Sequence, residues 1–278
     1  MKKNRIEQIA DGVYQIRYYW LGIADVSMYL IVGKDRALMI DSGYSTTHAK
    51  QYAETVTHLP IDLINTHGHF DHIGGNADFE TVYLSRADWI VAREHSDYDS
   101  LKILLDRYKA SSLAVRTLLG IPPIAKAADA TLRITPCRYT ELPAEGRLEL
   151  GDRSVLFFET PGHTMGSICI FDEKSRILFP GDMLCQEGVL LGFDYSTSVA
   201  QYLDSIRRIQ AFYRQNRGEK IFPAHQKTPV GLELFDRYID VCEKILRGEV
   251  RGKYKDMGLC RGLSVTRNGL TILYRENE

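Results

Sequence analysis

The stretch that decides how this chain is interpreted is Thr66-His67-Gly68-His69-Phe70-Asp71-His72-Ile73-Gly74-Gly75-Asn76. It places three histidines and one aspartate within six residues, directly after an apolar run at residues 61–64. A hydrophobic core has no use for such a cluster, and a solvated turn gains nothing from grouped imidazoles. Neutral imidazole nitrogens and carboxylate oxygens are, however, the usual ligands of a zinc-like dication. The stretch therefore predicts a metal site.

The local chain geometry indicates how these side chains could converge. If residues 61–65 form a strand that ends in a turn, His67 and His69 point the same way, because alternate residues share a face. Asp71 and His72 are adjacent, so we expect their side chains to diverge towards two neighbouring ions. A centre with two metals needs further ligands from elsewhere in the chain.

Three isolated polar residues can supply those ligands, because each follows a strand-like run. His163 comes after residues 155–158, Asp182 after 176–179, and His225 after 220–222. A single histidine or aspartate after a strand is more often a structural hydrogen-bonding residue. The same arrangement repeated three times after a histidine cluster favours a shared metal centre.

In order and spacing these residues resemble the metallo-β-lactamase fold superfamily, and specifically its binuclear hydrolase branch. The resemblance extends from about the first strand to His225. It implies that a first metal is held by His67, His69 and His163, and a second by Asp71, His72 and His225. Asp182 would bridge the two metals. Asp41 matches a family aspartate that supports the site without ligating, although a turn aspartate that ends a strand is an equal alternative.

The fold class implied is α/β, a four-layer αββα sandwich of two mixed β-sheets flanked by helices, formed by a single domain over residues 1–278. The residue pattern agrees, with clear strands predicted at 13–17, 27–32, 36–40, 81–84, 147–159, 167–171 and 176–179. Helices are predicted at 46–57, 198–215 and 232–246, the first capped by Ser45 or Thr46. Asn268-Gly269, between two alternating runs, predicts a terminal hairpin.

A helical insertion at about residues 86–130 is more than the minimal fold requires. In related enzymes this part of the chain often covers the active site, so we interpret it as a lid or substrate wall. A helical pair that thickens the outer layer or makes a dimer contact is an equal alternative. His95 and Arg107, within it, are interpreted as ordinary surface residues.

Composition narrows the class of protein. The chain has 278 residues and a net charge of −1, with no long basic run, so no nucleic-acid partner is expected. No stretch approaches membrane-spanning length, and the five scattered cysteines do not suggest a disulfide framework, so a cytoplasmic location is expected. We interpret Cys185 as a buried apolar residue rather than a neighbour of the metals. Oligomeric state is open, although the terminal hairpin offers an edge for a homodimer.

The resemblance implies hydrolysis with two divalent metal ions, with Zn²⁺ first and Mn²⁺ or iron as alternatives. A hydroxide that bridges the metals would attack a small ester, thioester or lactone. Asp71 and Asp182 are the implied catalytic residues, because Asp71 would orient the hydroxide and then help to protonate the leaving group. Tyr18-Tyr19-Trp20, in a predicted loop, could line the pocket, and the phenol of Tyr195 could polarise a carbonyl.

Other functions remain as alternatives: a phosphodiesterase, a mononuclear-iron sulfur dioxygenase, or a non-catalytic metal-dependent ligand binder. Oxygen-reducing di-iron relatives usually carry glutamate where this chain has His69, which argues against them. RNA-cleaving relatives typically need a large insertion before the last histidine or a basic arm, and only about one helix and one strand are predicted between Asp182 and His225. Glyoxalase II has a longer C-terminal helical domain for glutathione, so that substrate is doubtful.

Overall fold

The computed structural model describes residues 5–20, 24–103, 106, 131, 133–258 and 260–276. The first sheet has six strands in the order β1-β2-β3-β4-β5-β6. Its strands are β1 (Arg5–Ala10), β2 (Val13–Trp20), β3 (Ala24–Val32), β4 (Ala37–Ile40), β5 (Ile61–Ile64) and β6 (Val82–Tyr83). The first four strands pair antiparallel, whereas β4, β5 and β6 pair in parallel. The sheet is therefore mixed.

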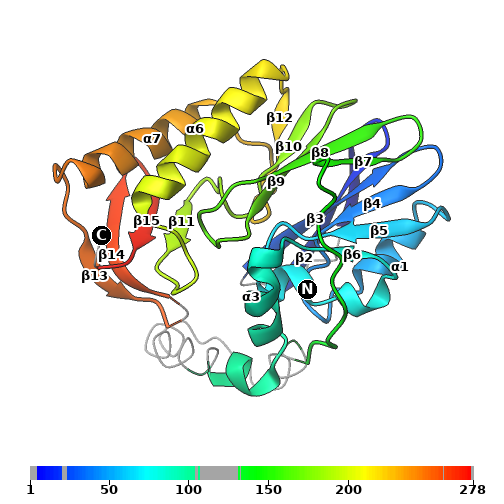
Figure 1. The fold of residues 1–278 in the computed structure, drawn as a ribbon, viewed down its shortest axis with the longest axis horizontal. Helices are drawn as coiled ribbons and strands as arrows, with labels where there is room; N and C mark the ends of the chain where they lie inside the picture. The colour runs from blue at the N-terminus through cyan, green and yellow to red at the C-terminus, as the bar shows by residue number, and fades with distance from the viewer. Residues whose placement is uncertain are drawn as a thin grey trace.

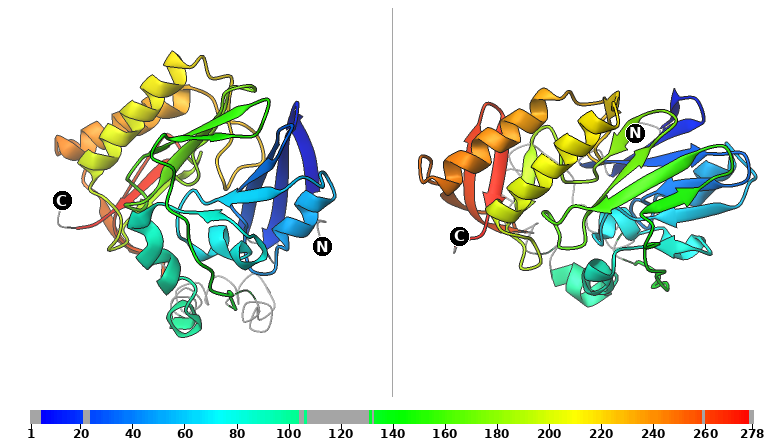
Figure 2. Two further views of the ribbon diagram at one scale, coloured as in Figure 1. Left: turned by 45° about the vertical axis from the view of Figure 1, so that its right-hand side comes forward. Right: turned by 45° about the horizontal axis from the view of Figure 1, so that its top comes forward.

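Two further sheets are built from the second half of the chain. The five-stranded sheet has the order β12-β10-β9-β8-β7, and the four-stranded sheet has the order β11-β15-β14-β13. The former contains β7 (Arg147–Glu149), β8 (Ser154–Glu159), β9 (Ile168–Asp172), β10 (Ile177–Phe179) and β12 (Lys220–Ile221). The latter contains β11 (Gly188–Leu191), β13 (Lys253–Asp256), β14 (Arg261–Arg267) and β15 (Leu270–Tyr274). Figures 1 and 2 show the first sheet and the four-stranded sheet on opposite sides of the molecule.

Helices cover the outer faces of these sheets (Figure 1). The short helices α1 (Ala49–Glu54) and α3 (Trp89–Glu94) contribute Ala49, Ala53 and Ala92 to a core on the outer face of the first sheet. The long helices α6 (Val199–Gln215) and α7 (Glu233–Leu246) pack side by side and share a core with the two later sheets. Ser198 begins α6 by accepting a hydrogen bond from the Gln201 backbone N–H.

A separate core lies between the first sheet and the five-stranded sheet. It joins side chains of the first sheet, such as Ile31 and Leu38, to Phe157, Ile170 and Phe179 of the second. Helix, sheet, sheet and helix thus form successive layers, which confirms the expected αββα sandwich. The four-stranded sheet contains the predicted terminal hairpin, formed by β14 and β15, whereas β11 and β13 were not expected.

A buried ion pair joins the two facing sheets at the starts of β8 and β10. Arg153 donates to the Asp11 and Val32 carbonyls of the first sheet, at 3.0 Å each. It also donates to the carboxylate of Asp172 in the second sheet, at 3.1 Å. These contacts fix the two sheets relative to one another, so the loops at the opposite ends of β8 and β10 meet the first sheet in a defined register.

Several local expectations were wrong. Tyr18-Tyr19-Trp20 does not form a loop but ends β2, where its residues pair with 24–26 of β3, because aromatic residues favour strands. Tyr18 bonds Thr46 through its hydroxyl and so makes ordinary packing contacts. Helix α1 begins at Ala49 rather than near Thr46, after His48 adopts a left-handed conformation with φ 56°.

The expected insertion is described only in part. Residues 86–94 form a single turn of 3₁₀ helix followed by α3, and residues 98–103 are helical. Arg107 and most of the segment from 104 to 132 lie outside the described residues, so the lid remains a prediction.

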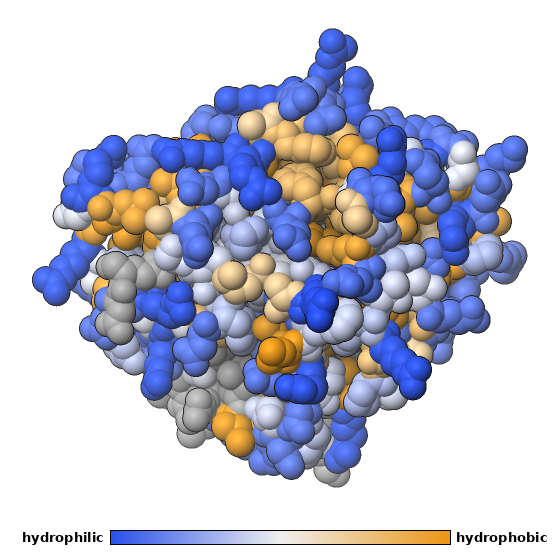
Figure 3. Space-filling model, in the orientation of Figure 1, coloured by the Kyte–Doolittle hydropathy of each residue, from blue (hydrophilic) through white to orange (hydrophobic). Residues whose placement is uncertain are grey.

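The surface seen in Figure 3 is mainly hydrophilic, with apolar side chains gathered near its upper centre. Within the described residues, no helix combines the length and the apolar character that a membrane crossing requires.

Candidate metal centre

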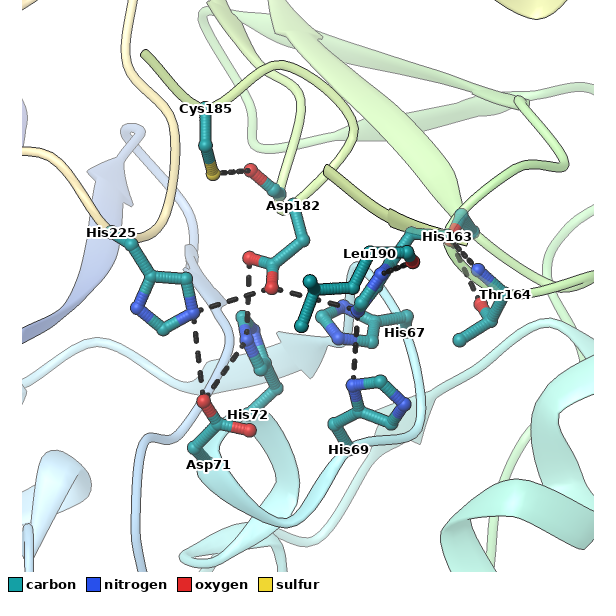
Figure 4. A network of polar contacts seen from close by, with 12 residues as sticks. His67, His69, Asp71, His72, His163, Thr164, Asp182, Cys185, Leu190 and His225 are labelled. Atoms are coloured by element: carbon teal, nitrogen blue, oxygen red, sulfur yellow. Dashed lines mark hydrogen bonds and ion pairs between the residues drawn. The ribbon is translucent and has the colours of Figure 1, made fainter. Parts of the chain in front are cut away.

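Four chain segments bring the predicted site residues together where strands end (Figure 4). His67 and His69 follow β5, and Asp71 and His72 lie in α2 (Phe70–Ile73). His163, Asp182 and His225 follow β8, β10 and β12, respectively. All seven side chains meet at one edge of the sandwich, although they come from points up to 158 residues apart, from 67 to 225.

The first cluster consists of His67, His69 and His163. One nitrogen from each ring lies within 4.8 Å of the others. His69 Nδ1 faces His163 Nε2 at 3.0 Å, and His163 Nδ1 donates to the Leu190 carbonyl at 2.8 Å. Because the Leu190 bond uses the proton of neutral His163, its Nε2 presents a lone pair to the cluster.

The second cluster consists of Asp71, His72 and His225, whose ligand atoms also lie within 4.8 Å of one another. Asp71 Oδ2 is 3.8 Å from His72 Nε2 and 3.5 Å from His225 Nε2. The expectation that Asp71 and His72 diverge was therefore wrong. The helical turn of α2, which begins after His69, lets both side chains converge with His225 instead.

Asp182 lies between the two clusters (Figure 4). Its Oδ1 is 3.5 Å from His72 Nε2, and its Oδ2 is 3.3 Å from His225 Nε2 and 3.6 Å from His163 Nε2. One carboxylate thus contacts histidines of both clusters. This is the position that a bridging ligand requires.

Asp41 orients His72 directly and His67 through Thr66, on the side of each ring that faces away from the site. Its Oδ2 accepts the N–H of His72 Nδ1 at 2.8 Å and the hydroxyl of Thr66 at 2.7 Å. Since the Thr66 proton is used in that bond, the hydroxyl oxygen accepts from His67 Nδ1 at 3.1 Å. Both rings therefore turn Nε2 towards the site. Asp41 has φ 58°, a conformation that aspartate tolerates better than most residues.

Asp88 joins two of the ligand-bearing loops, and sequence reasoning missed it. Its buried carboxylate accepts the backbone N–H of Gly68 at 2.8 Å, between His67 and His69. It also accepts the Thr164 hydroxyl at 2.7 Å and the Gly166 N–H at 2.8 Å, beside His163. Gly68 has a further role that was not expected, because a Cβ there would lie 2.9 Å from backbone atoms of Asp88 and Ala92.

The electrostatics of the two clusters differ. Burial and the neighbouring imidazoles hold the pKa values of His67 and His69 well below the usual range. At His72 burial also favours the neutral form, but the carboxylates of Asp41, Asp71 and Asp182 outweigh it and raise the pKa to about 9. The first cluster therefore offers neutral nitrogens, whereas the second is negatively charged and attracts a proton or a cation.

The donor set fits bound divalent metal ions. His67 Nε2, His72 Nε2 and Asp182 Oδ1 are buried and accept no hydrogen bond within the described part of the chain. Unsatisfied buried polar atoms are costly, so a group of them that faces one space requires a partner. Nitrogen and carboxylate oxygen atoms in that arrangement suit a zinc-like cation.

Other residues singled out from the sequence have different surroundings from those expected. His95 is not a surface residue, because it is 7% exposed and its ring stacks on His69 at 4.7 Å. The Tyr195 hydroxyl contacts His69 Nε2, on the other edge of the ring from the Nδ1 that faces His163. Cys185 is buried, as expected, but it also lies beside the proposed ligands Asp182 and His225, which was not expected.

An αββα sandwich with this cluster of histidines and aspartates at its edge defines a metal-dependent hydrolase. The family model of the metallo-beta-lactamase superfamily matches residues 21–225, and the chain belongs to that superfamily.

Relatives and solved structures agree with this assignment. The chain is 26% identical over 260 residues to "Acyl-coenzyme A thioesterase MBLAC2" of Homo sapiens, an alignment that covers 86% of this chain and 89% of the relative. It is 27% identical over 180 residues to "Hydroxyacylglutathione hydrolase" of Rhodospirillum rubrum, covering 65% of this chain and 52% of the relative. The crystal structure of DIM-1 metallo-beta-lactamase matches with a TM-score of 0.61 at 17% identity, covering 88% of this chain and 99% of that one.

Proposed function

We propose that the chain is a binuclear metallo-hydrolase that cleaves acyl thioesters, with acyl-coenzyme A preferred to glutathione thioesters. In this proposal His67, His69 and His163 hold one ion, and Asp71, His72 and His225 hold the other. Asp182 would be shared by the two ions. The observation that carries the proposal is that the Asp182 carboxylate lies 3.3–3.6 Å from histidines of both clusters.

The substrate class is supported by the relatives. Acyl-coenzyme A and hydroxyacylglutathione are both thioesters. The alignment with the coenzyme A thioesterase covers 89% of that relative, but the alignment with the glutathione hydrolase covers only 52%. About half of the glutathione hydrolase therefore has no counterpart in that alignment. Coenzyme A is therefore the better candidate for the thiol half of the substrate.

The metal ions and Asp71 would have different roles in the reaction. When bound, two dications would supply a Lewis acid for the carbonyl oxygen and lower the pKa of water to about 7. Asp71 is 15% exposed and contacts His72 and His225, so its carboxylate can orient the attacking water from the open side. A thiol leaving group has a pKa near 8.5, so it can depart as a thiolate without a strong general acid.

A substrate panel tests the proposal. Purified protein with added Zn²⁺ or Mn²⁺ is assayed with acetyl- and palmitoyl-coenzyme A, S-lactoylglutathione, 4-nitrophenyl acetate, a lactone and bis(4-nitrophenyl) phosphate. We expect acyl-coenzyme A to have a kcat/KM at least about tenfold above the others, a difference of about 1.4 kcal/mol in transition-state stabilisation. A chelator should abolish activity, and the same metal should restore it.

Other outcomes would contradict the proposal. A preference for the lactone or the phosphodiester would overturn the substrate class but keep the metal centre. Inertness towards every substrate, with two ions bound per chain, would favour a non-catalytic ligand binder.

A further inference from the structure

The hydroxyl of Tyr195 lies between two imidazole rings. Its oxygen is 2.9 Å from His69 Nε2 and 3.0 Å from His95 Nε2. Both distances are those of good hydrogen bonds. Tyr195 follows β11, and His95 follows α3, so the contact joins the two halves of the chain behind the first cluster.

The proton on His95 can be assigned from the network. The backbone N–H of Phe70 donates to His95 Nδ1 at 3.3 Å, so this nitrogen carries a lone pair. A neutral imidazole has one N–H, which then lies on Nε2 and donates to the Tyr195 oxygen. His95 is 7% exposed, and burial favours the neutral form of its imidazole.

The remaining lone pair of Tyr195 allows the tautomer of His69 that metal binding requires. A phenol oxygen can accept two hydrogen bonds, so it can also accept the N–H of His69 Nε2. In that tautomer His69 Nδ1 is unprotonated and faces the Nε2 lone pair of His163 at 3.0 Å. Two lone pairs at this separation repel one another unless a cation lies between them.

Ring contacts keep His69 in this orientation. His95 stacks on it with ring centroids 4.7 Å apart and planes 12° apart. Phe193 lies edge-on at 5.1 Å and stacks in turn on Tyr195 at 5.1 Å. The imidazole is thus held by a hydrogen bond at one nitrogen and by aromatic rings on its face and its edge.

We propose that Tyr195, supported by His95, is a positioning residue that fixes the ring of His69 and accepts the N–H of its metal-binding tautomer. This role rests on the proposed function of His69 as a ligand of the first metal. It concerns metal binding at the first cluster, because Tyr195 and His95 both contact His69, and we expect a smaller effect at the second cluster.

Metal affinity tests the role directly. Zn²⁺ is titrated into metal-free protein against a chromophoric chelator, and Co²⁺-substituted protein is followed by visible absorption. Tyr195→Phe should lower the affinity of one of the two ions by about 10–100-fold and shift the Co²⁺ spectrum of that ion. His95→Phe keeps a stacked ring but removes the bond to Tyr195, so it should cause a smaller loss at the same ion. The double variant should lose little more affinity than Tyr195→Phe alone, because His95 acts through the Tyr195 oxygen.

Two controls separate this inference from the proposed function. Tyr18→Phe removes a phenol hydrogen bond of the same length, 2.9 Å to Thr46, and should leave both affinities unchanged. His69→Ala should release the first ion, and if it does not, the proposed function itself fails. If His69→Ala releases the ion but Tyr195→Phe and His95→Phe bind both ions like the wild type, only the positioning role is overturned. Thermal unfolding of each metal-free variant verifies that it folds.

Discussion

The two clusters of the metal centre lie side by side but differ in charge and exposure. His67, His69 and His163 are nearly fully buried and have lowered pKa values. In the second cluster the side chains of Asp71 and His225 are 15% and 27% exposed, and the pKa of His72 is raised. The first cluster is therefore a preformed set of neutral donors. The second is an open, negatively charged set in which a metal ion must compete with a proton.

The strongest test of this comparison is the residue that the clusters share. Asp182→Ala removes the carboxylate that contacts both, so we expect loss of tightly bound metal at both clusters and a fall in kcat/KM of about 10³-fold or more. Elemental analysis and kinetics measure the two effects. Asp182→Asn is the matched control, because it keeps the shape but not the charge. Retention of two ions by the alanine variant would show that Asp182 does not bridge.

The pH dependence of metal affinity should separate the clusters. An ion at the second cluster must displace the His72 proton, so its affinity should rise about tenfold per pH unit from pH 7 and level off near pH 9. At the first cluster His67 and His69 are already neutral, so the affinity should be nearly flat over this range. Metal titrations at several pH values measure the affinity of each cluster, and a pH indicator follows the release of protons.

The proton on His72 also affects the stability of the metal-free protein. Metal affinity at the second cluster rises with pH, whereas this contribution to stability falls as the pH rises. Because the folded pKa of His72 lies above the unfolded value of 6.5, its contribution to stability is fully present below pH 6.5. The contribution is lost as the pH rises through about 9. If metal affinity rose equally with pH at the two clusters, the proposed difference in their charge would be contradicted.

Replacing Asp41 should affect the clusters unequally. It bonds His72 directly but reaches His67 only through Thr66. Asp41→Asn should therefore lower metal affinity by about 10–100-fold at the second cluster and by less at the first. Thr66→Val removes the hydroxyl that bonds His67 and also donates to Asp41, so it should lower metal affinity more at the first cluster than at the second. A larger loss at the first cluster in Asp41→Asn would show that the direct bond to His72 is unimportant.

The smallest effect is expected at Cys185. Burial, followed by the nearby Asp182 charge, raises the pKa of this thiol well above its usual range, so the thiolate that binds metals does not form at neutral pH. Cys185→Ala should keep both ions and change kcat/KM by less than about twofold, with a stability loss of about 1 kcal/mol. Loss of one metal equivalent would instead make Cys185 part of the centre.

Sequence reasoning reached the seven clustered residues because their chemistry is unusual. Grouped histidines have no role in packing, and repeated polar residues after apolar runs indicate strand ends that converge. The same reasoning failed where a residue type is common. Asp88 and His95 look like ordinary polar residues in the sequence, and their roles depend on partners such as Thr164 and Tyr195, which are 76 and 100 residues away.

The sequence by itself determined most strands and helices, the identities of the clustered side chains and their order along the chain, because periodicity and ligand chemistry are local properties. The four-layer arrangement was implied by the family resemblance. Only the tertiary structure decided which nitrogen of each histidine faces the site. It also decided that the helical turn of α2 makes Asp71 and His72 converge, and that the two clusters differ in charge. These properties depend on hydrogen bonds, burial and electrostatic interactions between distant segments, and such contacts exist only once the sheets have packed together.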